Sequence, residues 1–371
     1  MPLPQTGKAQ RPPGFIVTVR TMGSYHTQQK KNYTLKLRTL LAELPPFCGY
    51  YFRAMETQTS VLTRYGYAVD LRGFFEFLIA ETEALRGTPL PSLTLDDMNR
   101  VSTLDIELYL EKIAIYIKDA RERENNAAAR ARKLSAVRSL FKYLFKQGML
   151  HANVAALVDI PKQHERAIIR LEANEVADLL DTTESGSGLT KTQRYYHEAT
   201  RKRDIAILTL FLGTGIRISE LVGIDGRDID FESFAFRVTR KGGNQEVLAF
   251  GQEVADALWT YWEEREQTVA MEGHETAFFL SLQNRRITVR AVENLVKKYA
   301  SLAAPLKKIT PHKLRSTYGT MLYQESNDIY LVADVLGHKD VNTTRKHYAA
   351  LSQEKRRSAA KMVKLREDSP S

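Results

Sequence analysis

The C-terminal half of the chain carries six side chains whose types and order suit the cleavage of a phosphodiester bond. Five are cations or hydrogen-bond donors and the last is a phenol: Arg217, Lys241, His312, Arg315, His338 and Tyr348. In-line attack on a phosphodiester adds negative charge to the non-bridging oxygens, and guanidinium groups are well shaped to bind such oxygens. The set therefore predicts a reaction, whereas a basic composition alone would predict only a polyanionic partner.

Arg217 and Arg315 are the natural clamps for the phosphate oxygens. Arg217 follows the segment Gly213-Thr-Gly-Ile, which either lets the backbone approach a phosphate closely or simply ends a helix. Glu220 comes one turn later, where it can orient Arg217 or a neighbouring histidine, or form a structural ion pair.

Lys241 and its neighbour Arg240 lie in an expected hairpin, just before Gly242-Gly243. A lysine on a flexible turn can protonate a leaving 5′ oxygen, although an ordinary exposed lysine has the same setting. Arg240 competes for that role and is also a candidate DNA contact.

His312 and Arg315 are spaced i, i+3, so on a helix they share one face. Thr310 suits an N-cap and Pro311 the first helical turn, which puts His312 at the positive end of a helix, where anions bind. His338 comes at another helix start or turn and can donate to the same oxygens. A lone histidine is usually structural, but two at helix openings in a basic segment favour a site.

Tyr348 is the expected nucleophile. An unperturbed phenol has a pKa of about 10, so it needs nearby cations or a base to react at neutral pH. Arg345, Lys346 and His347 directly precede it, and only this setting distinguishes it among 17 tyrosines. No aspartate cluster indicates a Mg²⁺ site, so we expect chemistry without a metal or other cofactor.

The bulk composition fits a folded protein with a polyanionic partner. Its 371 residues allow two or three domains, and 43% hydrophobic residues can fill a sizeable core. The formal charge of +10 is found in ordinary basic proteins too, but nucleic acid is the commonest partner for it. The single cysteine, Cys48, excludes an internal disulfide and a thiolate-rich metal site. No stretch approaches the run of about 18 apolar residues that a membrane span needs, so we expect a cytoplasmic protein.

The elements that must position these groups fall into four segments. We expect a flexible basic tail over 1–30, a helical domain over 31–160, a linker over 161–170, and a second domain with the six side chains over 171–371. The pattern is mainly α, and short alternating strands at 228–250 predict a small antiparallel sheet. The polar stretch 183–203 reads as a surface loop.

The helix expected at 125–147 combines an apolar face with a row of cations. Its candidate DNA contacts are Arg130, Arg132, Lys133, Arg138 and Lys142. Such a row is either a solvated face or a surface that contacts phosphates. The lack of acidic partners along the same helix favours DNA, because i, i+4 ion pairing would need them.

Taken together, the six residues and their surroundings closely resemble the tyrosine recombinase (phage integrase) family. The segments Gly215-Ile-Arg-Ile-Ser-Glu-Leu221, Thr310-Pro-His-Lys-Leu-Arg315 and Leu336-Gly-His338 match the family's Arg, His-x-x-Arg and Leu-Gly-His boxes. Lys241 matches the lysine of its β-hairpin and Tyr348 its nucleophile. The resemblance covers about residues 171–360, and the helix at 125–147 is similar to one in the family's core-binding domain.

The resemblance implies a SAM-like helical core-binding domain followed by a mixed α/β catalytic domain. It also implies that Tyr348 forms a 3′-phosphotyrosyl link and that the freed 5′ hydroxyl attacks a partner strand, without metal or ATP. The family acts as a homotetramer on two double-stranded DNA sites with inverted half-sites. A C-terminal segment, here 349–365, docks on a neighbouring protomer, and an accessory directing protein is a further candidate partner.

Within the family, segments 41–51 and 64–78 resemble the single-recombinase Xer type of streptococci, which resolves chromosome dimers. The alternatives are an integrase or excisionase of a mobile element and, less favoured, an inactive DNA-bridging protein. A type IB topoisomerase would share the chemistry but not the site preference. The chain departs from many members at Ser316, where they have His, and in a spacing from His338 to Tyr348 that is one residue longer.

Overall fold

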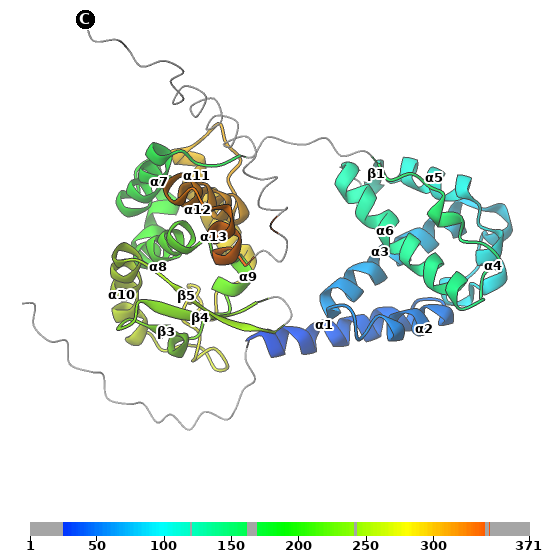
Figure 1. The fold of residues 1–371 in the computed structure, drawn as a ribbon, viewed down its shortest axis with the longest axis horizontal. Coiled ribbons are helices and arrows are strands. Elements are labelled where there is room, and N and C mark those ends of the chain that lie inside the picture. Colours follow the sequence, from blue (N-terminus) through cyan, green and yellow to red (C-terminus); the bar gives the residue numbers. More distant parts are fainter. Residues whose placement is uncertain (1–24, 119–120, 162–168, 241–242, 338–340, 342–371) are drawn as a thin grey trace, which may run out of the picture.

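The computed structural model describes residues 25–118, 121–161, 169–240 and 243–337, together with Val341 (Figure 1). Three of the expected catalytic residues, Lys241, His338 and Tyr348, lie outside the described residues. The expected docking segment 349–365 lies outside them as well. The structure does describe Arg240 and Gly337, which directly precede Lys241 and His338.

The N-terminal lobe is a helical bundle with one small hairpin. Its elements are α1 (Tyr25–Ala42), α2 (Pro46–Ala54), α3 (Val61–Glu81), α4 (Leu95–Arg100), α5 (Thr103–Lys112), β1 (Ile115–Lys118), β2 (Arg121–Glu124) and α6 (Ala127–Lys146). The helices α3 and α6 pack together in the core of the lobe. The ring centroid of Phe74 on α3 lies 5.1 Å from that of Tyr109 on α5 and 6.4 Å from that of Phe141 on α6. This packing fixes the cationic helix α6 on the lobe.

Capping residues set several helix boundaries in this lobe. Ser60 accepts from the Thr63 amide to begin α3, and Asn126 accepts from the Ala129 amide, at 2.9 Å, to begin α6. Pro46 occupies the first turn of α2, where its missing amide hydrogen is not needed. The expected helix at 125–147 is thus observed within two residues.

The C-terminal lobe is built around a long central helix. Its elements are α7 (Ala173–Ser185), α8 (Lys191–Thr214), α9 (Ile218–Leu221), β3 (Ile229–Asp230), β4 (Ala235–Thr239), β5 (Gln245–Ala249), α10 (Gln252–Glu266), α11 (Val289–Ala303), α12 (Pro311–Ser326) and α13 (Ile329–Val335). The buried half of α8 contacts α7, α10 and α12, while β3, β4 and β5 form one antiparallel sheet. The prediction of a mainly helical chain with a small antiparallel sheet is confirmed.

Three local predictions were wrong. The helix α1 begins at Tyr25, so the end of the expected tail is helical, and Tyr25 packs on the C-terminal lobe with the Arg286 guanidinium 5.4 Å from its ring. The hairpin β1–β2 interrupts a stretch that was expected to be helical. Residues 191–203, expected as a loop, form the first half of α8.

The polar first half of α8 is helical because its inward side faces a buried polar network. His197 Nδ1 lies 2.9 Å from the hydroxyl of Tyr299, which donates to Asp204 at 3.0 Å. Thr200 donates to the same carboxylate. These polar side chains satisfy one another across α8 and α11, so His197 and Thr200 are buried although they are polar, while most of the segment stays exposed.

Among the described residues, no helix is long and apolar enough to cross a membrane. The same residues contain no cluster of three or more His, Cys, Asp or Glu side chains able to hold a metal ion. Cys48 is buried in the N-terminal lobe, and its burial raises the pKa of the thiol.

Candidate active site

Arg217 is positioned by the sharp end of α8. The helix ends at Thr214, and Gly215 follows in the left-handed region with φ 60°. A Cβ at Gly215 would lie 2.5 Å from the ring of Tyr318 and 2.8 Å from Leu336, so only glycine fits there. Of the two alternatives left open by the sequence, the glycine-rich turn is therefore a helix C-cap. It places Arg217 at the N-cap of the short helix α9.

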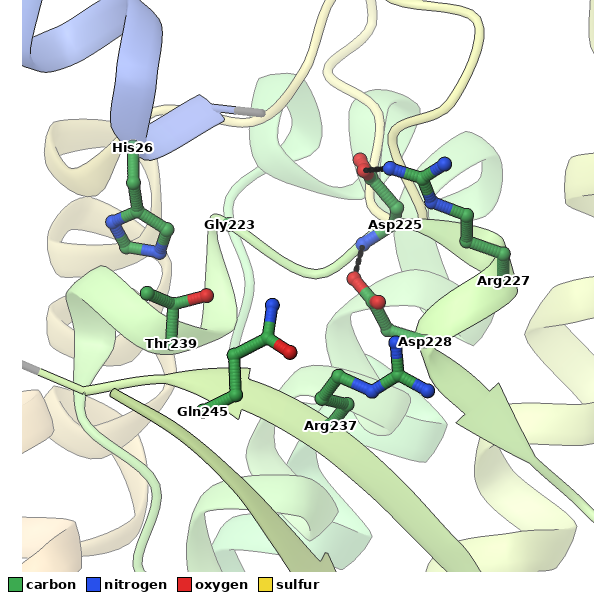
Figure 2. A pocket seen from close by; sticks show the side chains of 8 residues that line it. All are labelled: His26, Gly223, Asp225, Arg227, Asp228, Arg237, Thr239 and Gln245. Carbon is green, nitrogen blue, oxygen red and sulfur yellow. Dashed lines mark hydrogen bonds and ion pairs between the residues drawn. The ribbon is translucent and has the colours of Figure 1, made fainter. Parts of the chain in front are cut away.

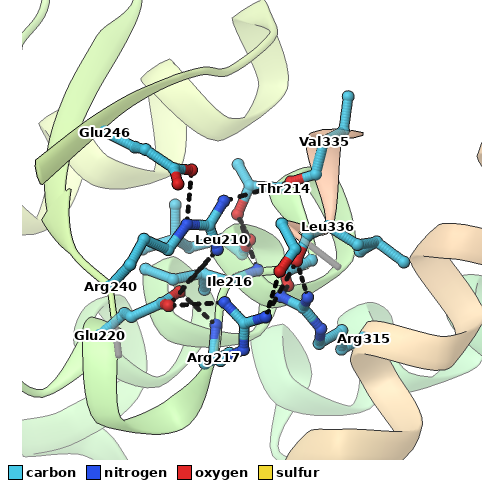
Figure 3. Close-up of polar contacts among 12 residues, drawn as sticks. Leu210, Thr214, Ile216, Arg217, Glu220, Arg240, Glu246, Arg315, Val335 and Leu336 are labelled. Atoms are coloured by element: carbon cyan, nitrogen blue, oxygen red, sulfur yellow. Dashed lines mark hydrogen bonds and ion pairs between the residues drawn. The ribbon is translucent and has the colours of Figure 1, made fainter. Parts of the chain in front are cut away.

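Arg217 and Arg315 converge on one backbone turn (Figure 3). Arg217 Nη2 donates to the carbonyl oxygens of Leu336 at 3.2 Å and Gly337 at 2.9 Å. Arg315, from α12, donates to the carbonyls of Gly215 and Leu336. The fold thus brings together the two arginines that the sequence singled out, beside the residue that precedes His338.

The two guanidinium groups differ in exposure. Arg315 is only 5% exposed, whereas the side chain of Arg217 is 32% exposed. Arg217 therefore has the more open surface toward an incoming phosphate, and Arg315 supports the same turn from inside the lobe.

Glu220 is a buried carboxylate shared by two arginines. It accepts from the backbone amide of Arg217 at 3.0 Å and from Arg217 Nη1 at 2.9 Å. It also accepts from Nη1 of Arg240, at 3.2 Å to Oε2. Since Glu220 is only 3% exposed, these bonds compensate its buried charge and fix the direction of Arg217.

Arg240 is turned into the lobe rather than toward solvent. It is 7% exposed, and its Nε donates to Glu246 at 2.6 Å. Nη2 donates to the carbonyl of Val335 at 3.4 Å. The sequence made Arg240 a candidate DNA contact and an alternative to Lys241; its guanidinium bonds Glu220, Glu246 and the carbonyl of Val335.

His312 lies in the first turn of α12, three residues before Arg315, and is exposed. Thr310 precedes it as N-cap and Pro311 occupies the first turn, as the sequence predicts, although Thr310 makes no side-chain capping bond. Ser316, where many relatives have His, donates its hydroxyl to the carbonyl of His312 at 3.1 Å. Its side chain therefore bonds along the helix.

The residues that precede Lys241 and His338 are in contact. Besides the bond from Arg240 to Val335, a Cβ at Gly337 would lie 2.9 Å from Cζ of Arg240. Gly337 also has φ 59°, so both backbone and space favour glycine. The end of β4 and the turn after α13 are thus held against each other.

A separate cavity of about 200 Å³ lies under the first turn of α1 (Figure 2). It is lined by His26 from α1 and by Asp225, Asp228, Arg237 and Gln245 of the C-terminal lobe. Of the expected catalytic residues that the structure describes, Arg217, His312 and Arg315 do not line it. Its lining combines two carboxylates, Asp225 and Asp228, with Arg227 and Arg237, so it is not the purely cationic site that favours a phosphate.

Comparison with known proteins decides the family. Residues 169–355, half of the chain, match the phage integrase family. The chain belongs to the phage integrase family of tyrosine recombinases. It is therefore a site-specific recombinase that breaks and rejoins DNA, and the resemblance predicted from the sequence is confirmed.

Two curated relatives span both lobes of this recombinase. Tyrosine recombinase XerS of Lactococcus lactis subsp. cremoris (strain SK11) is 29% identical over 342 residues, covering 84% of this chain and 94% of the relative. Tyrosine recombinase XerC of Caldanaerobacter subterraneus subsp. tengcongensis is 31% identical over 310 residues, covering 81% of each.

Solved structures show the same fold at lower identity. The XerH site-specific recombinase bound to palindromic difH substrate has a TM-score of 0.59 at 18% identity, over 81% of this chain and 80% of that one. The Tn1549 transposon integrase in complex with circular intermediate DNA has a TM-score of 0.58 at 18% identity, over 82% and 95%.

The cations of α6 in this recombinase have different surroundings. Arg132 and Lys133 both pair with Asp70, a 1% exposed carboxylate on α3, with Lys133 Nζ at 3.5 Å. Helix α6 itself carries no acidic residue, as the sequence indicates, but two of its cations find their acidic partner on another helix. The signal for this pairing in the sequence is Asp70 itself, an aspartate within the apolar pattern of α3.

The other candidate DNA contacts on α6 are Arg130, Arg138 and Lys142. Arg138 donates to the carbonyls of Ala155, at 3.1 Å, and of Val158, which lie after the helix. Arg130 is half-buried, whereas Lys142 is exposed. Of these three residues only Lys142 is exposed, and the bonds of Arg138 hold residues 155–158 against α6.

Proposed function

We propose that this recombinase cuts and rejoins two copies of a DNA site through a covalent 3′-phosphotyrosyl intermediate, as a Xer-type enzyme. The observation that carries the proposal is the convergence of Arg217 and Arg315, with Glu220 behind Arg217, on the turn that precedes His338. This arrangement suits a phosphate whose non-bridging oxygens gain charge in the transition state.

Each of the six residues then has a role in cleaving the phosphodiester bond. The Tyr348 oxygen loses its proton to a base and attacks phosphorus, while the bond from phosphorus to the 5′ oxygen breaks and that oxygen takes a proton from Lys241. Arg217, Arg315, His312 and His338 donate to the non-bridging oxygens. The 5′ hydroxyl of a partner strand later reverses the step, so the energy stays in the covalent bond and no cofactor is needed.

Resolution of chromosome dimers is the role that the relatives favour. The XerS relative matches this chain across both lobes, including the N-terminal region that resembles the single-recombinase type. Integration or excision of a mobile element is the second candidate, favoured by the fold shared with the Tn1549 integrase. A genomic neighbourhood with an inverted-repeat site and no mobile-element genes would support the first role.

The assembly follows from the same proposal. The chain would act as a homotetramer on two sites with inverted half-sites, with residues 349–365 docking on a neighbour, and an accessory protein would direct the reaction. The core-binding domain at 31–160 and the catalytic domain at 171–371, joined by the linker 161–170, would enclose the duplex. Two separate hydrophobic cores support this division. A chromosomal substrate would place the enzyme in the cytoplasm.

Trapping on a nicked duplex that carries the candidate inverted-repeat site tests the mechanism. We expect the wild-type chain to form an adduct with the 3′ end that resists denaturation, and Tyr348→Phe to form none. The matched control is Tyr195→Phe, since Tyr195 is a 77% exposed tyrosine on α8 and should leave adduct formation unchanged. An adduct with Tyr348→Phe would assign the nucleophile elsewhere, and no adduct with wild type would reject the proposed reaction.

A plasmid without the site separates the recombinase from a topoisomerase. Site-specific recombination predicts no relaxation of such a plasmid at protein concentrations that recombine a plasmid with two sites. Relaxation without a site would instead indicate topoisomerase activity.

A further inference from the structure

Arg240 links three segments that the catalytic site needs. Its backbone closes the β4–β5 hairpin. The amide of Arg240 donates to the carbonyl of Asn244 at 2.7 Å, and the carbonyl of Arg240 accepts from the amide of Gly243 at 3.0 Å. Its guanidinium reaches Glu220 on α9 and the carbonyl of Val335 at the end of α13. One side chain therefore connects the hairpin, the helix of Arg217 and the turn before His338 (Figure 3).

The inward direction of Arg240 is set by the strand that precedes it. Side chains at i, i+2 and i+4 of a strand share one face, and Phe236 and Val238 of β4 are buried while Arg237 is exposed. Arg240 comes two residues after Val238, so its side chain points to the same buried face, and it is 7% exposed. The guanidinium is therefore turned toward Glu220, Glu246 and the carbonyl of Val335 and away from solvent.

The charges around Arg240 explain why a buried cation is tolerated there. Glu220 faces it on one side and Glu246, with a 44% exposed side chain, faces it on the other. Glu220 is the same carboxylate that holds Arg217 through two hydrogen bonds. Without Arg240, that buried carboxylate would be held by Arg217 alone, and the pair would lose its fixed position.

We propose that Arg240 is a positioning residue, which fixes Glu220 and thereby aims Arg217 at the scissile phosphate. This inference rests on the proposed role of Arg217. Lysine cannot replace Arg240 in this role, because one ammonium group cannot bridge Glu220, Glu246 and the Val335 carbonyl as a planar guanidinium does. The nearby position of Gly337, where a Cβ would meet the guanidinium, fits the same requirement for close packing.

The test compares Arg240→Met and Arg240→Lys with Arg237→Met as the matched control. Arg237 lies on the same strand, carries the same charge and is exposed. DNA affinity is measured over a range of salt concentrations, and the single-turnover rate of adduct formation is measured on the nicked duplex at saturating protein. Thermal unfolding of each variant is recorded alongside.

We expect both Arg240 variants to form the adduct about 100-fold more slowly, the size of effect that a small misplacement of a catalytic group produces. Their DNA affinity and the slope of log affinity against log salt should equal those of wild type, and Arg237→Met should form the adduct at the wild-type rate. A salt slope reduced by about one in Arg240→Met, which removes the charge, would mean that Arg240 contacts a phosphate and would overturn the proposal. Wild-type adduct rates in those variants would overturn it as well.

A double-mutant cycle distinguishes positioning from general support of the fold. If Arg240 acts through Glu220, the double variant will form the adduct about as slowly as the slower of the two single variants, Arg240→Met and Glu220→Gln. A fold-reduction equal to the product of the two single reductions would reject the coupling. If Arg240→Met does not fold, Glu246→Ala carries the test, since it removes only the exposed partner of Arg240. It should slow adduct formation with unchanged DNA affinity, and a wild-type rate would contradict the proposal.

The two proposals fail in different ways. Absence of any adduct with the wild-type chain would remove the proposed reaction itself. A normal wild-type adduct together with normal Arg240 variants would remove only the positioning role.

Discussion

Arg217 and Arg315 donate to the same backbone oxygen, the carbonyl of Leu336, from helices that are far apart in the sequence. Two like charges can be held this close because carbonyl dipoles and the carboxylate of Glu220 compensate them. The position of each guanidinium is thus fixed by hydrogen bonds before DNA arrives. A fixed pair of donors stabilises developing charge without reorganising during the reaction.

The first prediction concerns the shape of these two donors. Arg217→Lys and Arg315→Lys keep the charge but lose the planar fork, so each should slow adduct formation by about 100- to 1000-fold, as removal of one oxyanion donor does. The measurement is single-turnover cleavage of the nicked duplex. Arg290→Lys is the control, because Arg290 lies on α11 with an 80% exposed side chain. Variants that cleave at the wild-type rate would show that no bidentate contact is made.

The second prediction concerns the stability of the C-terminal lobe. Glu220→Gln leaves two guanidinium groups without their shared buried carboxylate, which should lower the free energy of unfolding by about 3–5 kcal/mol. Both tryptophans of the chain, Trp259 and Trp262, lie on α10, so urea unfolding followed by tryptophan fluorescence reports on this lobe.

The control for this stability measurement is Glu293→Gln, which removes an exposed pair with Arg290 at 3.3 Å. Exposed pairs contribute up to about 1 kcal/mol, so this variant should unfold near the wild-type midpoint. An equal decrease in the free energy of unfolding of the two variants would mean that the buried ion pairs of Glu220 stabilise the lobe no more than an exposed pair does.

Sequence patterns located the elements well where local signals decide them. The Thr310-Pro311 pair marks a helix start through N-cap preference and proline geometry, which depend only on nearby residues. The first half of α8 was missed because His197 and Thr200 are polar yet buried, and only the distant Tyr299 and Asp204 make that burial favourable.

The direction of individual cations was harder to predict. Arg240 and Lys241 are adjacent, and nothing in their types tells which one turns inward, although the alternation of Phe236 and Val238 could have indicated it. Arg132 and Lys133 have no acidic partner on their own helix, and sequence spacing reveals only partners within one helix. Their partner, Asp70, lies on α3 and meets them only in the folded lobe.

The third prediction separates DNA contact from structural support on α6. Lys142 is exposed, so Lys142→Ala should weaken DNA binding for all sequences and reduce the salt slope by about one. Arg138→Ala should leave the slope unchanged but destabilise the lobe, because carbonyls after the helix lose their donor. Affinity against salt, with hydrogen exchange of residues 150–158, measures both effects. A reduced slope in Arg138→Ala would assign that residue to DNA.

The fourth prediction concerns the contact between α1 and the C-terminal lobe. Burial lowers the pKa of His26, although the carboxylate of Glu220 opposes this shift and Arg286 adds to it; Asp225 and Asp228 also face the ring. Because the folded-state pKa lies below the unfolded value of about 6.5, protonation favours release. The contact is therefore fully stable above that value and weakens as the pH falls through it toward the lower folded-state pKa.

Hydrogen exchange of residues 25–35, corrected for the intrinsic pH dependence, measures this release. Protection should be lower at pH 5.5 than at pH 8 in the wild-type chain, and His26→Gln should remove the difference. His151→Gln is the control, because His151 is exposed in the N-terminal lobe and should leave the pH response intact. Equal protection at both pH values in the wild-type chain would mean that the packing of Tyr25 against Arg286, and not the charge state of His26, holds the first turn of α1.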